Sequence, residues 1–362
     1  MTKVYKYYKE LPDGKYELAF ITRSSKFFKR EMILRLVNGD ELYDPCADYP
    51  HLAASIEMFV KDVDNGQEYF QHFSNGYAER VPLEIKTERE RELYLKGCLQ
   101  EHYEEACDLG HEVFAIVLQG SQNYDMDMYT EEYCSDVDTK CIVLPTPEQL
   151  IRGTKPISET YERENKEHID LKDIRLMFDC FKKQNVNYVE ILFSDFCYVP
   201  EEYQSYWEEL RDMAEDITKA YPSQLLKTMS GMSMEKLKAL KHPYPSLLDK
   251  IEKYGYDPKQ AHTIVRMNDF VHRYLMGLSF KDSMHPSPYI RKKLFDLKLG
   301  KYALADVEAL CKDIDSETKT LKDEYIKENG EEIKNPGVFD KLDNLKVDIL
   351  MSFFKEVLKV GD

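Results

Sequence analysis

The stretch HEVFAIVLQGSQNYDMDMYTEEYCSDVDTKCIVLP, residues 111–145, decides how the chain folds around its most informative side chains. It holds an apolar run at 111–119, a Gly-Ser pair, a polar acidic loop and a second apolar run that ends at Pro145. The two runs predict two strands joined by a loop. Because side chains alternate along a strand, Asp136 and Asp138 should project from one face, roughly 7 Å apart.

This order of residues predicts a site for a nucleoside triphosphate and its metal ions. Two neighbouring carboxylates can bridge hard divalent cations. Beside them, Gly120 and Ser121 offer backbone N–H groups and a hydroxyl to phosphate. An isolated Asp-x-Asp in so acidic a chain is more often a pair of solvated charges at a strand end, and a lone Gly-Ser is only a turn. Their combination in this order favours the phosphate and metal interpretation.

The composition is that of an ordinary water-soluble protein with two or three domains. The chain has 362 residues, of which 43% are hydrophobic and 32% charged, and no apolar run approaches the roughly 20 residues of a membrane span. Its charged, tyrosine-rich beginning differs from a secretory signal, which favours a cytoplasmic location without membrane contact. The 8 cysteines lack C-x-x-C spacing and the 9 histidines lack H-E-x-x-H spacing, so we expect neither a zinc site nor a disulfide framework.

The charge is distributed unevenly along the chain. The formal net charge of −17 argues against a protein that simply coats nucleic acid, since such binding depends on neutralising phosphates. Residues 227–301, however, hold 15 Lys or Arg and 7 Asp or Glu, a local charge of +8. A basic helical module suits an anionic substrate. The alternative is a chance cluster spread over several helix faces.

Three regions follow one another along the chain. The predicted boundaries are 1–82 for an N-terminal β-rich region, 83–200 for a core and 201–362 for a helical domain. The first region contains two hairpin signals, a Pro-Asp-Gly turn at 12–14 and the pair Asn38-Gly39. A helix that opens at the capping-box pair Thr87 and Glu90 and closes at Gly110 precedes the first strand of the core.

A third carboxylate is expected in the segment 157–170, which alternates loosely and predicts a third strand. Asp170 fits the end of that strand best, with Glu167 and Asp173 as neighbouring alternatives. Asp173 is also explained as a charge in the first turn of the following helix, stabilised by the helix dipole. That helix is predicted within 170–184 from an apolar stripe, which consists of Ile174, Met177, Phe178 and Phe181.

Four segments resemble a known family. They are GSQNY, SDVDTKCIVLP, EHIDLKDIRLMF and NVNYVEILFS. They are similar to the nucleotidyltransferases of the DNA polymerase beta superfamily, and among these to the RNA-repair-associated RlaP branch. The resemblance covers about 111 to 200, is fainter over 254–267 and 297–310, and is absent before about residue 80. It implies an α+β fold, with a nucleotidyltransferase-type mixed sheet, flanking helices, an N-terminal β-rich extension and a C-terminal helical domain.

The resemblance also implies roles for the residues that match the family motif. Gly120 and Ser121 would contact the triphosphate. Asp136 and Asp138 would bind two Mg²⁺ ions, with Mn²⁺ as an alternative, and Asp170 resembles the third acid. The implied reaction is in-line attack of an acceptor hydroxyl on the α-phosphorus, with one ion lowering the pKa of that hydroxyl and the other neutralising the departing pyrophosphate.

Further residues are candidates for contact with the nucleotide. Tyr124 could stack on a base or ribose, or it could be a core tyrosine. Lys259 and Arg266 are seven residues apart and share a predicted helix face, with His262 between them. Both could reach phosphates from across a cleft. Solvated surface charge is the alternative.

Three features leave alternatives open. The family usually has glycine after Tyr124, whereas here Asp125 begins a longer acidic loop, 125–134, that would repel a triphosphate unless it points outward or binds cations. His168 is expected to be a hydrogen-bonded neighbour rather than a ligand. Glu190 could be catalytic or a structural partner of a backbone group or of Arg175.

The expected function is transfer of a nucleoside monophosphate from an NTP, with ATP as one candidate, to an acceptor hydroxyl. An RNA end in RNA repair is favoured by the basic segment 227–301. Transfer to a small molecule or a protein, as in toxin- or resistance-type members of the superfamily, is mildly favoured by the acidic net charge. A catalytically silent scaffold that binds a nucleotide or a partner is the alternative from another class of protein.

Overall fold

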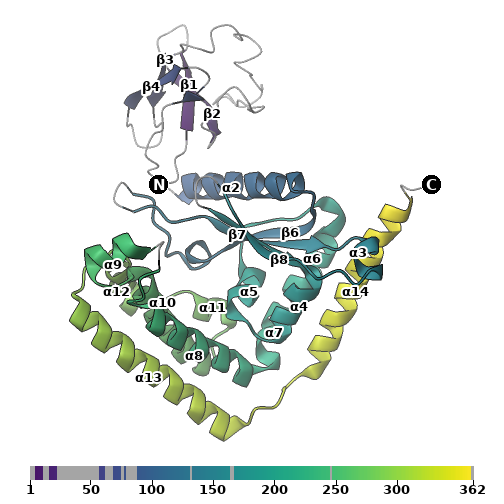
Figure 1. Cartoon of the computed structure of the whole chain (residues 1–362), viewed down its shortest axis with the longest axis vertical. Helices are drawn as coiled ribbons and strands as arrows, with labels where there is room; N and C mark the ends of the chain where they lie inside the picture. Colours follow the sequence, from purple (N-terminus) through teal and green to yellow (C-terminus); the bar gives the residue numbers. More distant parts are fainter. Residues whose placement is uncertain are drawn as a thin grey trace. The chain divides into compact units, whose positions relative to one another are not determined.

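The computed structural model describes residues 5–10, 16–22, 57–61, 68–74, 77–78, 88–130, 133–163, 167–244 and 247–359 (Figure 1). Contacts divide the chain into two compact units. One comprises Met1–Gly97 with Met128–Asp136, and the other Cys98–Asp127 with Val137–Asp362. The division into three domains at residues 82 and 200 stays a prediction.

The N-terminal unit contains short antiparallel strands. Strand β1 (Tyr5–Glu10) pairs with β2 (Tyr16–Thr22), which confirms the strands of the first predicted hairpin. Strand β3 (Glu57–Lys61) pairs with β4 (Glu68–Ser74), which in turn pairs with β5 (Tyr77–Ala78). The turn at 12–14 and the hairpin predicted around Asn38-Gly39 lie outside the described residues.

Five described strands form the sheet of the second unit, in the order β10-β6-β7-β9-β8. Their bounds are Glu112–Gln119 for β6, Asp138–Leu144 for β7, Ser158–Glu162 for β8, His168–Asp173 for β9 and Cys197–Tyr198 for β10. Strands β7 and β9 are parallel, and the other pairs are antiparallel. The sheet is therefore mixed, and the chain is α+β, as predicted.

Two strand boundaries differ from the prediction. The segment expected to form one strand makes two antiparallel strands, β8 and β9, and the Arg163 N–H donates to the carbonyl oxygen of Glu167 at 2.9 Å beside their last pair. Strand β7 begins at Asp138 rather than at Ser135. Ser135 is already held in the loop, where it exchanges hydrogen bonds of 2.7 and 3.0 Å with Met128.

Helices make up most of the second unit. Helix α2 (Glu88–Asp108) crosses the division between the units and ends before Gly110, whose φ of +85° is accessible to glycine. Of the capping-box residues, Thr87 lies outside the described residues, and the side chain of Glu90 is not described. The others are α3 (Pro147–Ile151), α4 (Ile174–Lys182), α5 (Val186–Val189), α6 (Gln204–Asp212), α7 (Ala214–Ala220), α8 (Pro222–Ala239), α9 (Leu248–Tyr254), α10 (Pro258–Leu275), α11 (Phe280–Met284), α12 (Pro288–Lys298), α13 (Leu304–Asn329) and α14 (Pro336–Lys359). In the described part of the chain, no helix combines the length and the apolar character that a membrane crossing needs.

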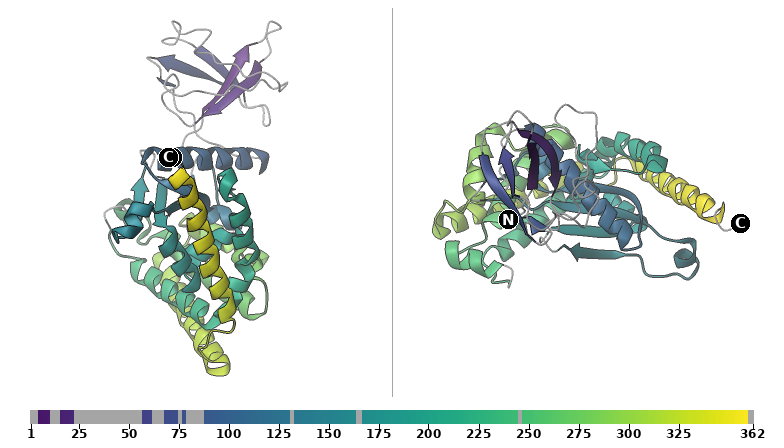
Figure 2. Two further views of the ribbon diagram at one scale, coloured as in Figure 1. Left: turned by 90° about the vertical axis from the view of Figure 1, so that its right-hand side faces the viewer. Right: turned by 90° about the horizontal axis from the view of Figure 1, so that it is seen from above.

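The core of the second unit lies between the sheet and α4, which packs on β7 and β9 (Figure 1). The predicted stripe of α4 is fully buried and consists of Ile174, Met177, Phe178 and Phe181. Helix α14 packs against α4 and α7, and Lys182 bonds Asp343 at 2.9 Å (Figure 2). The described second half of α2 packs on the opposite face of the sheet, where His102 meets Thr139 of β7.

Asp173 caps α4 instead of entering its first turn. It is the last residue of β9, and its carboxylate accepts the backbone N–H of Arg175 at 2.9 Å and the Arg175 guanidinium at 2.6 and 2.8 Å. The prediction that Asp173 stabilises the start of this helix is confirmed. Its position differs by one step, because β9 ends at Asp173, which is therefore the N-cap and not a residue of the first turn.

We expect Asp173→Ala to lower the free energy of unfolding by about 1–2 kcal/mol, since an N-cap and a charged hydrogen bond are lost. Urea unfolding followed by circular dichroism measures this. Asp179→Ala, which removes a more exposed acid of the same helix, is the control. Equal midpoints for the two variants would contradict the capping role.

Candidate functional site

The Gly-Ser turn is fixed in place by buried polar contacts. Gly120 follows β6 with φ +85° and ψ −145°, a conformation that strongly favours glycine. A single 3-10 turn, Ser121–Tyr124, comes next. Asn123 donates to the carbonyl oxygen of Leu118 at 2.9 Å and accepts the Ser194 hydroxyl at 2.7 Å. The turn therefore presents its backbone from a defined position at the end of β6.

Glu190 lies behind this turn. Its carboxylate accepts the Gly120 N–H at 3.3 Å, and its side chain is only 5% exposed. Burial raises the pKa of Glu190, while the positive charge of Arg266 and the bond to Gly120 act in the opposite direction. Of the partners expected for Glu190, the structure supplies the backbone group, because Arg175 is bonded to Asp173 instead.

Arg266 covers the ring of Tyr124 beside the turn. The guanidinium carbon lies 4.0 Å from the ring centroid, and the two residues are 8% and 7% exposed. Among the described residues Arg266 makes no hydrogen bond or ion pair, and its Nε is buried without a partner. Tyr124 belongs to a core cluster with Ile264 and Val265 of α10, which is the core position left open as the alternative to base stacking.

The other predicted residues of α10 differ in exposure. Lys259 is exposed in the first turn, where its N–H bonds the N-cap Asp257 at 3.1 Å. His262 is buried, and its Nδ1 lies 3.1 Å from the Leu294 carbonyl oxygen. Burial lowers the pKa of His262 to about 3, so its ring is neutral at physiological pH. Of the two basic residues, Arg266 is the buried one that packs on the Tyr124 ring, while the charge of Lys259 also acts on Tyr124.

The predicted acids Asp138 and Asp170 lie on one face of the sheet and are both bonded. Asp138 Oδ1 accepts the backbone N–H of His168 at 3.0 Å and lies 3.1 Å from its ring Nδ1. Asp170 Oδ2 lies 2.6 Å from Lys140 Nζ and 3.3 Å from the Tyr188 hydroxyl. His168 is thus a hydrogen-bonded neighbour, as expected.

The fit to metal ions differs among the three acids. Both contacts of His168 with Asp138 are made at Oδ1 of the carboxylate. Asp136 is exposed just before β7. Both residues therefore offer carboxylate oxygen of the kind that Mg²⁺ prefers. Asp170 does not fit as a third ligand in this arrangement, because the Lys140 ammonium occupies the position of a cation. Over the described ranges, no three His, Cys, Asp or Glu side chains are arranged to hold a metal ion. Asp136 falls in the first unit, and its placement beside Asp138 stays a prediction.

Glu167, an alternative third acid, is committed elsewhere. It is buried with His102, whose Nε2 lies 3.0 Å away, and it accepts Arg163 at 2.9 Å. Arg163 also bonds Glu105 and Glu101 of α2. This network joins α2 to the sheet and explains Glu167 as a structural residue.

Sequence reasoning missed the basic partner of Asp170. Lys140 follows Asp138 by two positions, so the same alternation that grouped the acids places this lysine on their face. Its partner could not be foreseen, because it depends on the register of β7 against β9, in which Lys140 pairs with Asp170.

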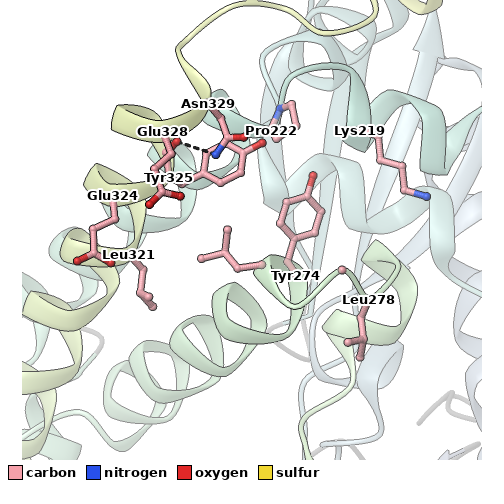
Figure 3. Close-up of a pocket in the computed structure, with 11 residues that line it drawn as sticks. Lys219, Pro222, Tyr274, Leu278, Leu321, Glu324, Tyr325, Glu328 and Asn329 are labelled. Carbon is pink, nitrogen blue, oxygen red and sulfur yellow. Dashed lines mark hydrogen bonds between the residues drawn. The ribbon is translucent and has the colours of Figure 1, made fainter.

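A separate pocket of about 480 Å³ lies in the helical half (Figure 3). Tyr274 of α10 and Tyr325 of α13 line it, together with Lys219 and Glu328. It contains none of the predicted site residues, so the predicted nucleotide site lies elsewhere.

Comparisons with known proteins give little further information. No protein-family model matches the chain, and no curated protein matches it. One solved structure, a nucleotidyltransferase-like protein from Exiguobacterium sibiricum, is 11% identical with a TM-score of 0.23, over 74% of this chain and 79% of that one. A similarity of this size carries no conclusion about activity.

Proposed function

We propose that this chain is a nucleotidyltransferase that moves a nucleoside monophosphate from an NTP to an acceptor hydroxyl. The observation that carries the proposal is the buried guanidinium of Arg266 beside the Gly-Ser turn. The Glu190 carboxylate feels the charge of Arg266 but forms no ion pair with it, and a buried guanidinium whose Nε has no partner is costly. A phosphate group would supply a bonded anionic partner, since guanidinium binds phosphate through charged hydrogen bonds.

In this proposal the residues of the turn and of the sheet divide the work. Arg266, Ser121 and the backbone N–H groups of the turn bind the phosphates, and Glu190 positions Gly120. Asp136 and Asp138 would hold Mg²⁺ or Mn²⁺, and His168 orients Asp138. When bound, the metal would neutralise phosphate charge and lower the pKa of the acceptor hydroxyl.

An RNA end is the acceptor that we favour. The basic segment 227–301 supports this choice, because several of its basic residues lie in α10 and α12.

Two basic residues of α12 also hold the start of the acidic loop. Arg291 and Lys298 donate to the carbonyl oxygens of Asp125 and Met126. Part of that loop is thus held by cations, which reduces the repulsion expected between it and a triphosphate.

Incubation with each α-labelled NTP, Mg²⁺ and total RNA tests the function. We expect release of pyrophosphate and a label that ribonuclease removes. A label that resists ribonuclease but is removed by protease would replace RNA with a protein acceptor. Absence of pyrophosphate release with every NTP would contradict nucleotidyl transfer and favour a silent scaffold.

Arg266→Met is expected to raise the Kd for NTP roughly ten- to hundredfold, the equivalent of a lost hydrogen bond to a charged group. Calorimetry on the full chain measures this. Lys253→Met is the matched control, because Lys253 also lies over a tyrosine ring, 4.8 Å from the Tyr254 centroid, but is exposed. An unchanged Kd in Arg266→Met would show that Arg266 only packs on Tyr124.

A further inference from the structure

Two lysines from neighbouring strands face one aromatic ring. The ammonium of Lys140 on β7 lies 4.0 Å from the centroid of Tyr188 on α5, and that of Lys172 on β9 lies 4.7 Å from it. Both are more than nine-tenths buried, with 4% and 7% of their surface exposed. Asp170 and Lys172 are two positions apart on β9 and therefore project from the same face of the sheet. Lys140 of β7 shares this face, which is the one on which α4 and α5 lie (Figure 1).

Among the described residues, only one negative charge, that of Asp170, is paired with these two ammonium groups. Lys140 bonds Asp170, while Lys172 donates to the neutral hydroxyl of Ser158 at 2.8 Å. In the described part of the chain, no carboxylate forms an ion pair with Lys172. Attraction to the Tyr188 ring offsets part of the cost of burial, but it does not neutralise the charge.

Helix α4 also lines this cluster. Burial raises the pKa of the Cys180 thiol, and Lys172, Lys183 and Lys140 act against that rise while Asp179 adds to it. The thiol therefore lies within the field of both buried lysines. Ser158, which accepts the hydrogen bond from Lys172, is itself an exposed residue of the edge strand β8, whereas Lys172 is buried.

We propose that Lys140, Lys172 and the Tyr188 hydroxyl form a subsite for a phosphate group carried by a substrate. Two ammonium groups and a hydroxyl are donors that suit a phosphate dianion, whose two charges balance those of the lysines once Asp170 is displaced from Lys140. A phosphate bound there also competes with Asp170 for Lys140 and so releases the Asp170 carboxylate. The substrate class rests on the proposed function, whereas binding of phosphate by the subsite does not.

Calorimetry with inorganic pyrophosphate, without magnesium, tests the subsite directly. It is performed in an Arg266→Met background, so that binding at the Gly-Ser turn does not mask it. We expect Lys172→Met to weaken the remaining binding at least tenfold, and Lys172→Arg to keep it within about threefold. Lys183→Met, which removes an exposed lysine at the end of α4, is the control and should bind as its parent does.

Stability without ligand gives a second readout. Because Lys172→Met removes a buried charge that lacks an anionic partner, its melting temperature should equal or exceed that of its parent when pyrophosphate is absent. Pyrophosphate should raise the melting temperature of the parent but not that of the variant. If Lys172 were purely structural, Lys172→Met would melt at a lower temperature than its parent both with and without pyrophosphate.

The source of the phosphate is distinguished by three further ligands. These are ATP, an oligoribonucleotide with a 5′-phosphate and the same oligoribonucleotide with a 5′-hydroxyl. A loss confined to ATP assigns the subsite to the nucleotide, and a loss confined to the phosphorylated RNA assigns it to the acceptor. Parental affinity of Lys172→Met for pyrophosphate and for all three ligands would overturn the proposal. If Lys172→Met loses affinity for pyrophosphate while Arg266→Met binds NTP as the parent does, the subsite is supported and the proposed nucleotide site at the Gly-Ser turn is refuted.

Discussion

Asp138→Asn is expected to reduce nucleotidyl transfer roughly hundredfold or more while leaving the fold intact. The amide keeps the shape of the side chain and an oxygen for the His168 backbone N–H, but it removes the charge that would bind the metal ion. Single-turnover rates with saturating NTP measure the loss, and melting curves check the fold. Asp136→Asn should behave in the same way.

Asp195→Asn is the matched control for this variant. Asp195 has an exposed side chain, 3.3 Å from Lys281 and 3.6 Å from Arg211, and it takes no part in the proposed site. Its substitution should leave the rate unchanged. Transfer at the parental rate by well-folded Asp138→Asn would refute the assignment of Asp138 to the metal.

Asp170→Asn is expected to be costly in two ways. Removing one partner of a buried ion pair leaves the Lys140 charge uncompensated, which should lower the free energy of unfolding by about 3–5 kcal/mol. If Asp170 also serves the reaction once Lys140 has moved, single-turnover transfer should fall as well. Urea unfolding and rates on the same preparations measure both losses.

The double variant Lys140→Met with Asp170→Asn separates the two roles of Asp170. An apolar side chain in place of the lysine should restore most of the stability, because replacing a whole buried pair is often neutral. Transfer should remain below that of Lys140→Met alone, since the double variant lacks the carboxylate as well. Recovery of both stability and transfer would show that Asp170 is only the partner of Lys140, and the third acid would have to be sought elsewhere.

Local patterns predicted those parts of the fold that depend on local physics. The continuous apolar run of β6 and the apolar stripe of α4 are set by which side chains can be buried together. The turn at Gly120 follows from a backbone conformation that few other residues adopt. For the candidate site, helical spacing grouped Arg266 with Lys259, but only packing distinguishes the buried Arg266 from the exposed Lys259.

The parts that could not be predicted depend on how distant segments pair. The register of β7 and β9 decides that Asp170 meets Lys140, and no feature near either residue encodes that register. The same is true of Glu167, whose partner His102 is 65 positions earlier in the chain. Sequence motifs therefore indicated which acids to consider, while tertiary pairing decided which of them are already bonded.

The position of α14 in the core has a consequence for protein synthesis. Helix α14 contributes apolar side chains to the same core as α4 and the sheet, namely Val338, Leu342, Leu345, Ile349 and Phe353. The core cannot be closed until this last helix has left the ribosome. At about 5–20 residues per second, β6 waits roughly 10 to 50 s for it. During translation the part of this core that α14 covers therefore stays exposed, and a nascent chain that stops before α14 cannot complete the unit that carries the candidate site.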